Sequence, residues 1–354
     1  MKRNKACIIF LMLLTFSCQK IREAPLIDIK KAKFHIEKIS AIADSIGYIQ
    51  LETDSGCLIR NIRQLYISND RIFVRDQQQK VFVFDLHGGF LNEIGAKGKG
   101  PGEYIYVYDF ALDNERKKIY LLDVKYIREY DYSGTFTGRS FKSYGFYSFI
   151  FNRGLFYCYS PPEIPVRIKG RNMKIVIMND AGEVIHTLLP ARTVEGAMFV
   201  TPGNFYLKGR KVFFLDSQDN VFFELDSLSV KEKYVFRYGK KKKNERKSLY
   251  GKGLEVKHVF NYKTLLIFDY TLDNEWFIGL YKKSEGGIYC IGKNEKGDIG
   301  FIDDFGEGPV IYPRFFTDFG FIDVVDIRKK DVTDPVDAEN PQLRLVYLKK
   351  QYCL

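Results

Sequence analysis

The residues most suggestive of chemistry form a glycine-rich stretch, Gly95 to Tyr104, with the sequence GAKGKGPGEY. Glycines that follow a strand and open a helix can cradle a phosphate with their backbone N–H groups. A dinucleotide site requires G-x-G-x-x-G, and a P-loop requires G-x-x-x-x-G-K followed by Ser or Thr. Neither spacing is present, and the residues from Glu103 onward, EYIYVYDFAL, are aromatic and typical of a strand. The stretch therefore predicts a turn and argues against a nucleotide site.

Motifs for metal binding or hydrolysis are missing as well. No G-x-S-x-G, H-E-x-x-H, H-x-H or C-x-x-C pattern occurs. Most carboxylates occupy turn contexts in which the side chain caps its own backbone, and we interpret Asp109, Asp303 and Asp304 as loop structure too. The sequence thus predicts no catalytic residue, no metal site, no disulfide framework and no cofactor, and leaves open only a cation held in a channel. The histidines are scattered along the chain, at His35, His87, His186 and His258. The cysteines are scattered too, and we expect them to serve as small apolar side chains: Cys57, Cys158, Cys290 and Cys353.

The chain begins like an export signal. A basic start is followed by an apolar run that is too short to span a bilayer as a mature helix. The run ends at Ser17-Cys18, and polar residues follow, which resembles a bacterial lipoprotein signal. We therefore predict a signal peptide over residues 1–17, lipidation of Cys18 and attachment to the outer membrane, on a side that the sequence does not specify. An ordinary signal peptide with an incidental cysteine is the alternative.

A repeat in the sequence predicts the strands that would position any functional site. A short apolar strand, a polar turn, a second apolar strand ending in an acidic or amide residue, and a glycine turn recur along the chain. With 24 Tyr and 30 Phe, the composition also favours β-structure. The spacing of the turn residues is nearly even except for the last interval, which is longer. We align these turn residues as Asp85, Asp131, Asp180, Asp226 and Asn294.

A unit of about 45 residues with four short antiparallel strands predicts a β-propeller blade. One blade cannot bury both faces of its sheet, so blades stack radially. Two strand-like pieces near opposite chain ends, IGYIQLET and PQLRLVYLKK, can complete a sixth blade between them. We predict an all-β, six-bladed propeller as a single domain over residues 18–354, with the last blade closed by N- and C-terminal strands so that no edge is left free. A β-sandwich is the main rival.

The glycine stretch fits this repeat as a crossing from the outer strand of one blade to the inner strand of the next. Its G-x-G-P pattern recurs at Gly306 to Pro309, four blades later. Crossing loops converge on one face of a propeller, so we expect a ligand there. Aromatic residues near the inner strands, Tyr108 and Tyr147 among them, could stack on sugar rings or hold a peptide. The candidate ligand-binding residues are Lys99, Glu103, Tyr104, Tyr106, Tyr312 and Arg314.

A basic insertion near residues 239–262 lies inside the longest interval between repeats. Such a loop can be a solvated excursion, or it can lie against anionic head groups or acidic polysaccharide. An exported protein is not expected to meet nucleic acid. The candidate contacts to an anionic surface are Lys240, Lys241, Lys242, Lys243, Arg246 and Lys247.

Taken together, the signal-like start, IGYIQLET, RIFVRD, VFVFDLHGGF, YDYSGTF and ENPQLRLVYLKK resemble the six-bladed, NHL-like β-propeller lipoproteins of Bacteroidota. The resemblance covers nearly all of the mature chain and implies the propeller fold and a cell-envelope location. It implies little about activity, because that family is largely uncharacterised. Our leading hypothesis is a lipid-anchored propeller that binds a glycan or an envelope protein without catalysis. The alternative is a propeller hydrolase or lyase that acts on polysaccharide or peptide with a channel-bound cation.

Overall fold

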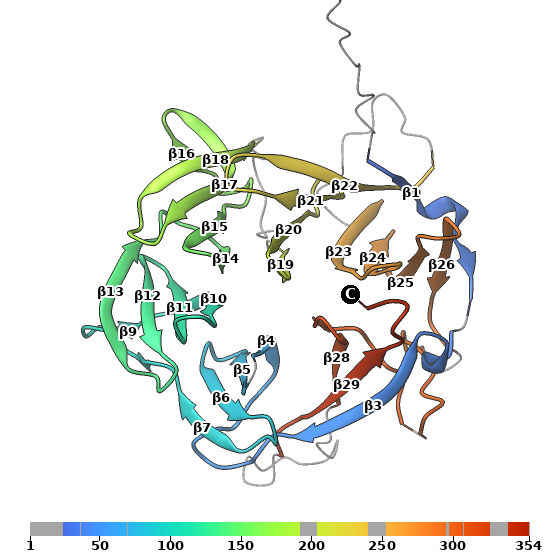
Figure 1. Cartoon of the computed structure of the whole chain (residues 1–354), viewed down its shortest axis with the longest axis horizontal. Coiled ribbons are helices and arrows are strands. Elements are labelled where there is room, and N and C mark those ends of the chain that lie inside the picture. The colour runs from blue at the N-terminus through green and yellow to red at the C-terminus, as the bar shows by residue number, and fades with distance from the viewer. Residues whose placement is uncertain are drawn as a thin grey trace, which may run out of the picture.

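The protein is described by a computed structural model that places residues 24–353, apart from residues 36, 69, 192–203, 240–252, 295–296, 307 and 326–338. The described strands form six large sheets around a central axis, plus one small two-stranded sheet (Figure 1). This confirms the predicted six-bladed, all-β propeller. None of the described helices is long and apolar enough to cross a membrane.

Each blade is a run of antiparallel strands that starts nearest the axis and ends at the outer edge (Figure 1). Blade 1 contains β4 (Ile62–Ile67), β5 (Arg71–Asp76), β6 (Val81–Asp85) and β7 (Phe90–Glu93), and blade 2 contains β10 (Val107–Asp113), β11 (Lys118–Asp123), β12 (Tyr126–Asp131) and β13 (Phe136–Lys142). Blade 3 contains β14 (Ser148–Asn152), β15 (Leu155–Tyr159), β16 (Val166–Ile168), β17 (Arg171–Asn179) and β18 (Val184–Pro190). Blade 4 contains β19 (Asn204–Lys208), β20 (Lys211–Asp216), β21 (Val221–Leu225) and β22 (Val230–Arg237), and blade 5 contains β23 (Leu254–Asn261), β24 (Leu265–Leu272), β25 (Glu275–Lys282) and β26 (Gly287–Ile291).

Blade 6 is built from both ends of the chain, as predicted. Its strands are β27 (Phe315–Phe316), β28 (Gly320–Val325), β29 (Gln342–Leu348) and, outermost, β3 (Ala43–Gln50). The pairing of β3 with β29 is antiparallel. It closes the ring, so the first and last blades meet without a free edge between them.

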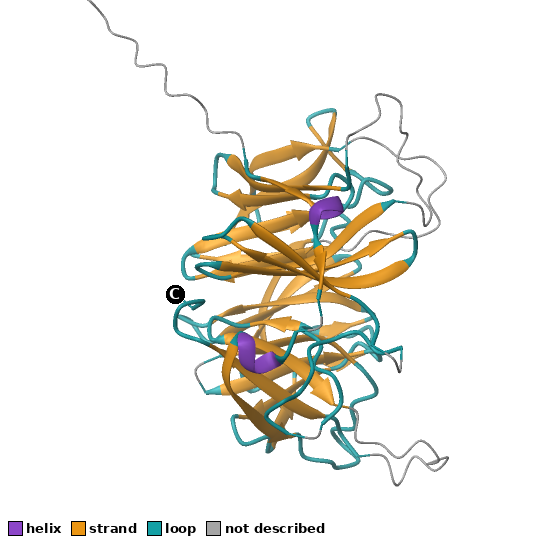
Figure 2. Cartoon of the chain, turned by 90° about the vertical axis from the view of Figure 1, so that its right-hand side faces the viewer, coloured by secondary structure: helices purple, strands orange, loops and turns teal. Residues whose placement is uncertain are grey.

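Residues 26–50, which we call the N-terminal belt, run along the outer edges of three blades. β1 (Leu26–Asp28) pairs in parallel with β22 of blade 4, and β2 (Lys33–Phe34) pairs in parallel with β26 of blade 5. Two 3-10 helices, η1 (Ile29–Lys31) and η2 (Ile39–Ala41), connect these strands on the outside of the ring (Figure 2). The sequence analysis placed only the last part of this segment in a blade, because strands as short as β1 and β2 have almost no periodic signal.

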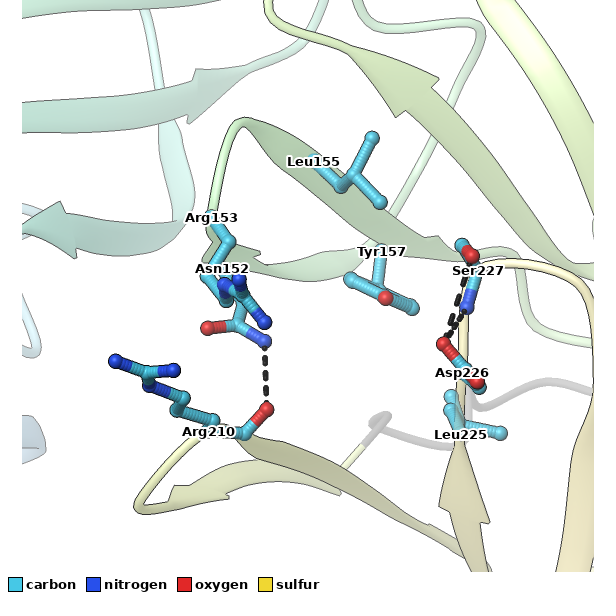
Figure 3. Close-up of a pocket in the computed structure, with 8 residues that line it drawn as sticks. All are labelled: Asn152, Arg153, Leu155, Tyr157, Arg210, Leu225, Asp226 and Ser227. Atoms are coloured by element: carbon cyan, nitrogen blue, oxygen red, sulfur yellow. Dashed lines mark hydrogen bonds between the residues drawn. The ribbon is translucent and has the colours of Figure 1, made fainter.

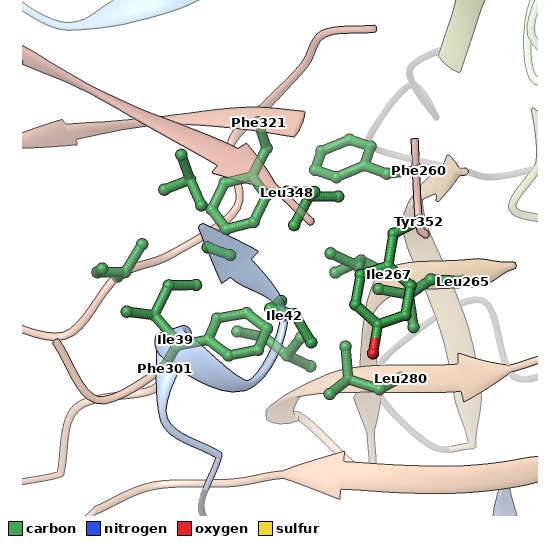
Figure 4. Close-up of a cluster of buried hydrophobic side chains, with 14 of the residues drawn as sticks. Ile39, Ile42, Phe260, Leu265, Ile267, Leu280, Phe301, Phe321, Leu348 and Tyr352 are labelled. Carbon is green, nitrogen blue, oxygen red and sulfur yellow. The ribbon is translucent and has the colours of Figure 1, made fainter. Parts of the chain in front are cut away.

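The belt is held by apolar side chains that reach into the ring. Ile27 and Ile29 are buried in the cluster between blades 4 and 5. Ile39 and Ile42 are buried beside Phe301 and Phe321, where blades 5 and 6 meet (Figure 4). The cysteines also belong to the interior, as expected, since Cys57, Cys158 and Cys290 are buried free thiols and Cys353 is partly buried.

The predicted turn residues are partly confirmed. Oδ1 of Asp85 accepts the N–H groups of His87 at 2.8 Å and Gly89 at 2.9 Å, and these bonds hold the pKa of Asp85 below its ordinary value. Asp131 caps the equivalent turn of blade 2. In blade 3 the capping side chain is that of Asn179, so the alignment on Asp180 was one residue late.

The alignment on Asn294 was wrong. Asn294 caps a turn of the same kind, with its Oδ1 accepting the N–H of Asp298 at 2.9 Å. That turn follows β26, in the crossing to blade 6, whereas the turn between β25 and β26 is formed by residues 283–286. A sequence of this type forms the same capped turn within a blade and in a crossing. The local sequence therefore does not show which strands the turn joins.

A buried ion-pair network fixes the crossing from blade 5 to blade 6. Arg344 of β29 is 1% exposed and donates to Asp303 at 3.2 Å and to Asp323 at 2.5 Å. It also donates to the carbonyls of Pro309 and Val310. A Cβ on Gly308 would lie 2.8 Å from Asp303 Oδ2, so the glycine allows this close approach.

We predict that Arg344→Ala lowers the free energy of unfolding by about 3 to 5 kcal/mol, because it leaves two buried carboxylates without their partner. Urea unfolding followed by tryptophan and tyrosine fluorescence measures the change. Lys293→Ala is the control, since this lysine and its partner Glu275 are 51% and 58% exposed and an exposed pair contributes only about 0 to 1 kcal/mol. Equal effects of the two substitutions would contradict a special role for Arg344.

Candidate functional site

The candidate residues lie in two crossings on the same face of the ring. Lys99, Glu103, Tyr104 and Tyr106 lie between β7 and β10, and Tyr312 and Arg314 lie between β26 and β27. Because every blade starts at the axis and its strands alternate in direction, all crossings emerge on one face, which we call the crossing face. The two groups come from different sectors of that face.

The glycine stretch is a self-supporting blade crossing. β8 (Ala96–Lys97) pairs with β9 (Glu103–Tyr104), and Glu103 Oε2 accepts the N–H of Gly100 at 2.7 Å. A Cβ on Gly98 would lie 2.0 Å from the same oxygen, so only glycine fits beneath this carboxylate. The side chain of Glu103 is therefore occupied in holding the loop.

Tyr104 is turned into the core. It is 1% exposed, its hydroxyl lies 3.4 Å from Glu93 Oε1, and burial raises the pKa of its phenol. Lys99 and Tyr106, by contrast, are exposed to solvent. Of the four candidates in this crossing, these two present their side chains to a ligand.

Tyr106 begins a row of three rings that we call the tyrosine row. The centroids of Tyr106 and Tyr108 are 4.7 Å apart, and those of Tyr108 and Tyr147 are 4.9 Å apart. Tyr106 is 41% exposed, and its hydroxyl accepts a hydrogen bond from Gln79 Nε2 at 3.2 Å. The row thus spans the crossing into blade 2, strand β10 and the crossing into blade 3. Further exposed apolar residues nearby on blade 2 are Ile105, Val124 and Tyr126.

Polar side chains behind the row connect the inner strands of adjacent blades. Gln64 donates to the carbonyl of Phe110 at 3.0 Å, and Asp109 Oδ2 accepts the N–H of Phe149 at 2.8 Å. Burial raises the pKa of Asp109 to about 6, and the nearby Arg75 opposes this shift. Gln64 and Asp109 both follow a register shift in their strand, which re-aims a side chain. Asp109 was predicted to serve loop structure, whereas it lies within β10 and links that strand to blade 3.

His258 lies in blade 5 at the position equivalent to Gln64 and Asp109, and its side chain bonds within its own blade. It also follows a register shift, and it lies directly across from Asp269 of β24. Its Nδ1 lies 2.9 Å from Asp269 Oδ1, while its side chain is half-exposed and the Asp269 side chain is buried. The hydroxyl of Tyr312 donates to Asp269 Oδ2 at 2.6 Å. A buried carboxylate therefore orients an imidazole whose Nε2 remains available to a ligand.

Two opposing influences act on His258. Partial burial lowers the pKa of its imidazole, the Asp269 carboxylate raises it through charge and hydrogen bonding, and the net result is a pKa above the ordinary value. The sequence analysis missed this pair, because the two residues are separated along the chain and only the hairpin of β23 and β24 brings them together. The basic insertion predicted near residues 239–262 includes His258, whereas Leu254–Asn261 forms β23, the inner strand of blade 5.

Arg314 lies in the same sector as Tyr312. Its side chain is exposed, with Nε 3.7 Å from Asp323 Oδ1, and Asp323 also pairs with buried Arg344. Tyr312 and Arg314 thus flank two buried carboxylates, those of Asp269 and Asp323. Asp303 and Asp304 hold structure, as expected, since Asp304 accepts hydrogen bonds from the backbone N–H and the hydroxyl of Ser40.

A metal centre is not visible in the part of the chain that the structure describes, where no three His, Cys, Asp or Glu side chains are grouped to hold an ion. A surface hollow lies between blades 3 and 4 (Figure 3). It is lined by the turns that follow the inner strands β14 and β19, which are on the face opposite the crossings. None of the six candidate ligand residues lines it. Its lining residues are Asn152, Arg153, Leu155, Tyr157, Arg210, Leu225, Asp226 and Ser227.

The remaining predicted sites lie outside the described residues. These are the lipidation site Cys18 and the basic residues Lys240, Lys241, Lys242, Lys243, Arg246 and Lys247. Their roles stay predictions.

Comparison with known proteins agrees with the fold. A family model described as "Domain of unknown function (DUF4934)" matches residues 24–346. A crystal structure of a predicted exported protein from Bacteroides fragilis is similar with a TM-score of 0.67 and 17% identity, covering 92% of this chain and 100% of that one. Hydrazine synthase from Kuenenia stuttgartiensis gives a TM-score of 0.42 with 8% identity, over 70% of this chain and 72% of the other. No curated protein sequence matches the chain.

We predict that Asp269→Asn lowers the pKa of His258 to below its ordinary value, because the carboxylate that raises it is lost while burial remains. Tyr312→Phe is the matched control and should leave the pKa of His258 unchanged or higher, since it removes a donor to Asp269 but keeps the carboxylate. NMR titration of the imidazole signals measures both, and with four histidines in the chain the signals are assignable by substitution. A pKa of His258 that does not move in Asp269→Asn would show that the pair does not form.

Proposed function

The chain belongs to the family described as a domain of unknown function (DUF4934), and from this premise we propose that it is an exported, lipid-anchored propeller of the cell envelope that binds a glycan without altering it. An envelope protein is the other partner that the same surface could accept. We propose no cofactor and no nucleic-acid partner for this activity.

The tyrosine row is the observation that supports this proposal. Tyr106 is exposed and Tyr108 and Tyr147 lie partly buried beside it, so three neighbouring phenol rings from two crossings and one inner strand gather at the crossing face. A sugar ring has apolar C–H faces and a rim of hydroxyls, so it can stack on such rings and form hydrogen bonds at its edge. The exposed side chains of Lys99, Arg314 and His258 elsewhere on the crossing face could add polar contacts for a longer ligand.

Export is supported by the sequence of residues 1–18 and by the similar Bacteroides fragilis protein, which is described as a predicted exported protein. Anchoring is supported by the lipoprotein-like sequence at Ser17-Cys18 alone. We propose that Cys18 is lipidated and that the protein resides at the outer membrane. NHL-like propeller lipoproteins remain the resemblance that the sequence suggests.

A second candidate function, hydrolysis or elimination on a polysaccharide or peptide, is favoured by the His258–Asp269 pair. An imidazole oriented by a buried carboxylate can act as a general base. A cation-assisted form of this chemistry would need several carboxylates or imidazoles to converge, and the described residues contain no such group. Binding therefore has the better support.

We predict that Tyr106→Ala and Tyr147→Ala each weaken glycan binding about five- to tenfold, because a ring contact contributes about 1 kcal/mol beyond its buried area. A glycan array identifies the ligand, and titration calorimetry measures the affinity of each variant. Tyr48→Ala is the control, since Tyr48 is 52% exposed but lies on the outer strand of blade 6. Absence of any ligand on the array, together with an envelope protein recovered by pull-down, would replace the glycan with that protein.

We predict that the native chain incorporates a clickable fatty acid in cells and that Cys18→Ala does not, because only the thiol accepts the lipid. Gel fluorescence after labelling measures incorporation, and Cys353→Ala is a control that retains Cys18. Label in the Cys18→Ala variant would refute the anchor and leave an ordinary signal peptide.

A further inference from the structure

The outer edge of blades 4 and 5 has an unusual distribution of charge. Lys30, Lys31 and Lys33 of the N-terminal belt are exposed, and none forms an ion pair with a described residue. The acidic residues of the same stretch turn inward, since Glu37 is buried against His35 and Asp28 accepts backbone N–H groups. Between Leu26 and Lys38 the belt therefore presents its positive charges to solvent and keeps its two carboxylates bonded to neighbouring groups, whereas Asp44, further along at blade 6, is exposed.

Large apolar side chains are exposed among these lysines. Leu26 is 44% exposed, Phe34 is 65% exposed and Tyr238 is 50% exposed. All three lie at the edge that β1 and β2 add to blades 4 and 5. Apolar and aromatic groups interspersed with lysine are the combination that binds at a lipid head-group interface, where rings enter the boundary layer and ammonium groups meet phosphate.

The same edge is the place where the two predicted membrane-directed segments meet the ring. The backbone N–H of Val235 donates to the carbonyl of Pro25 at 3.1 Å, and the N–H of Gly239 donates to Asp28 Oδ1 at 2.8 Å. The start of the described chain and the end of β22 are thus adjacent. Residues 240–252, which continue from this point, contain six Lys or Arg residues more than Asp or Glu residues in the sequence.

The length of the leading chain adds a distance limit. If Cys18 carries the lipid, six peptide units separate it from Ala24, which allows a span of at most about 20 Å. So short a tether keeps this edge within about 20 Å of the bilayer.

We propose that the rim formed by Leu26, Lys30, Lys31, Lys33, Phe34, Arg237 and Tyr238 docks on an anionic phospholipid surface. The distance limit rests on the proposed lipid anchor, whereas the charge and the exposed apolar groups do not. Phospholipid is favoured over acidic polysaccharide because the exposed aliphatic side chain of Leu26 is buried well only by acyl chains, which also accommodate Phe34 and Tyr238.

Docking at this edge orients the ring. Blades 1 and 2 lie across the ring from β1 and β26 (Figure 1). The crossing between them, which contains Lys99 and Tyr106, then points away from the membrane. A bound lipid and a bound glycan would therefore occupy opposite sides of the protein, and neither would block the other.

The test uses the exported chain from residue 18 with Cys18→Ser, so that no lipid anchor contributes. Sedimentation with vesicles of phosphatidylglycerol and phosphatidylethanolamine should show binding that falls with added salt, and vesicles of phosphatidylcholine should bind far less. The triple variant Lys30→Glu, Lys31→Glu and Lys33→Glu should lower the affinity at least about tenfold, at about 1 kcal/mol for each charge near the surface. The matched control reverses three exposed lysines elsewhere, Lys117, Lys169 and Lys350, and should retain the affinity.

Hydrogen exchange on the unsubstituted chain gives a second readout that does not depend on any variant. Vesicles should slow exchange in residues 26–38 and leave residues 105–128 unchanged. Equal binding to both vesicle types, equal losses in the two triple variants, or protection confined to residues 105–128 would each overturn the proposal. Glycan binding should be the same in both triple variants, so a failure of the rim is distinguishable from a failure of the proposed glycan site.

Discussion

The antiparallel pairing of β3 with β29 is the contact on which the rest of the structure depends. A propeller blade buries both faces of its sheet only when it has a neighbour on each side, so an open ring would expose two blade faces to water. Strand β3 lies far from β29 in sequence, and its pairing is reinforced by Ile39 and Ile42, which pack where blades 5 and 6 meet. Closure therefore combines hydrogen bonding at the edge with apolar burial beneath it.

Closure also decides what each face of the ring can do. All crossings are brought to one face, and two polar side chains that follow strand bulges, Gln64 and Asp109, tie the inner strands of blades 1 and 2 to the next blade. Blade 5 has His258 at the corresponding position, where the imidazole pairs with Asp269 inside its own blade and stays half-exposed. Blades 1 and 2 use the side chain after such a bulge for structure and blade 5 leaves it half-exposed, and this difference marks His258 for function.

The outer edge of the ring differs from the crossing face in the side chains that it exposes. Strand edges in propellers are normally short and left to solvent, which limits unwanted pairing. Here β1 and β2 cover the edges of blades 4 and 5, and in doing so they place lysines and exposed apolar groups together on the outside. The N-terminal belt thus covers two strand edges and also forms the rim proposed to meet the lipid surface.

The repeat of strand and turn signals was sufficient to predict the fold, the blade number and the closing strands, because alternation and turn chemistry are local properties that each blade repeats. The glycine stretch was likewise identified as a crossing from its recurrence. The parallel belt strands, the true position of the Asn294 turn, the burial of Tyr104 and the pairing of His258 with Asp269 were not predictable in this way. Each depends on which strands become neighbours and on which side of a strand a bulge turns a side chain, and only the closed tertiary structure decides that.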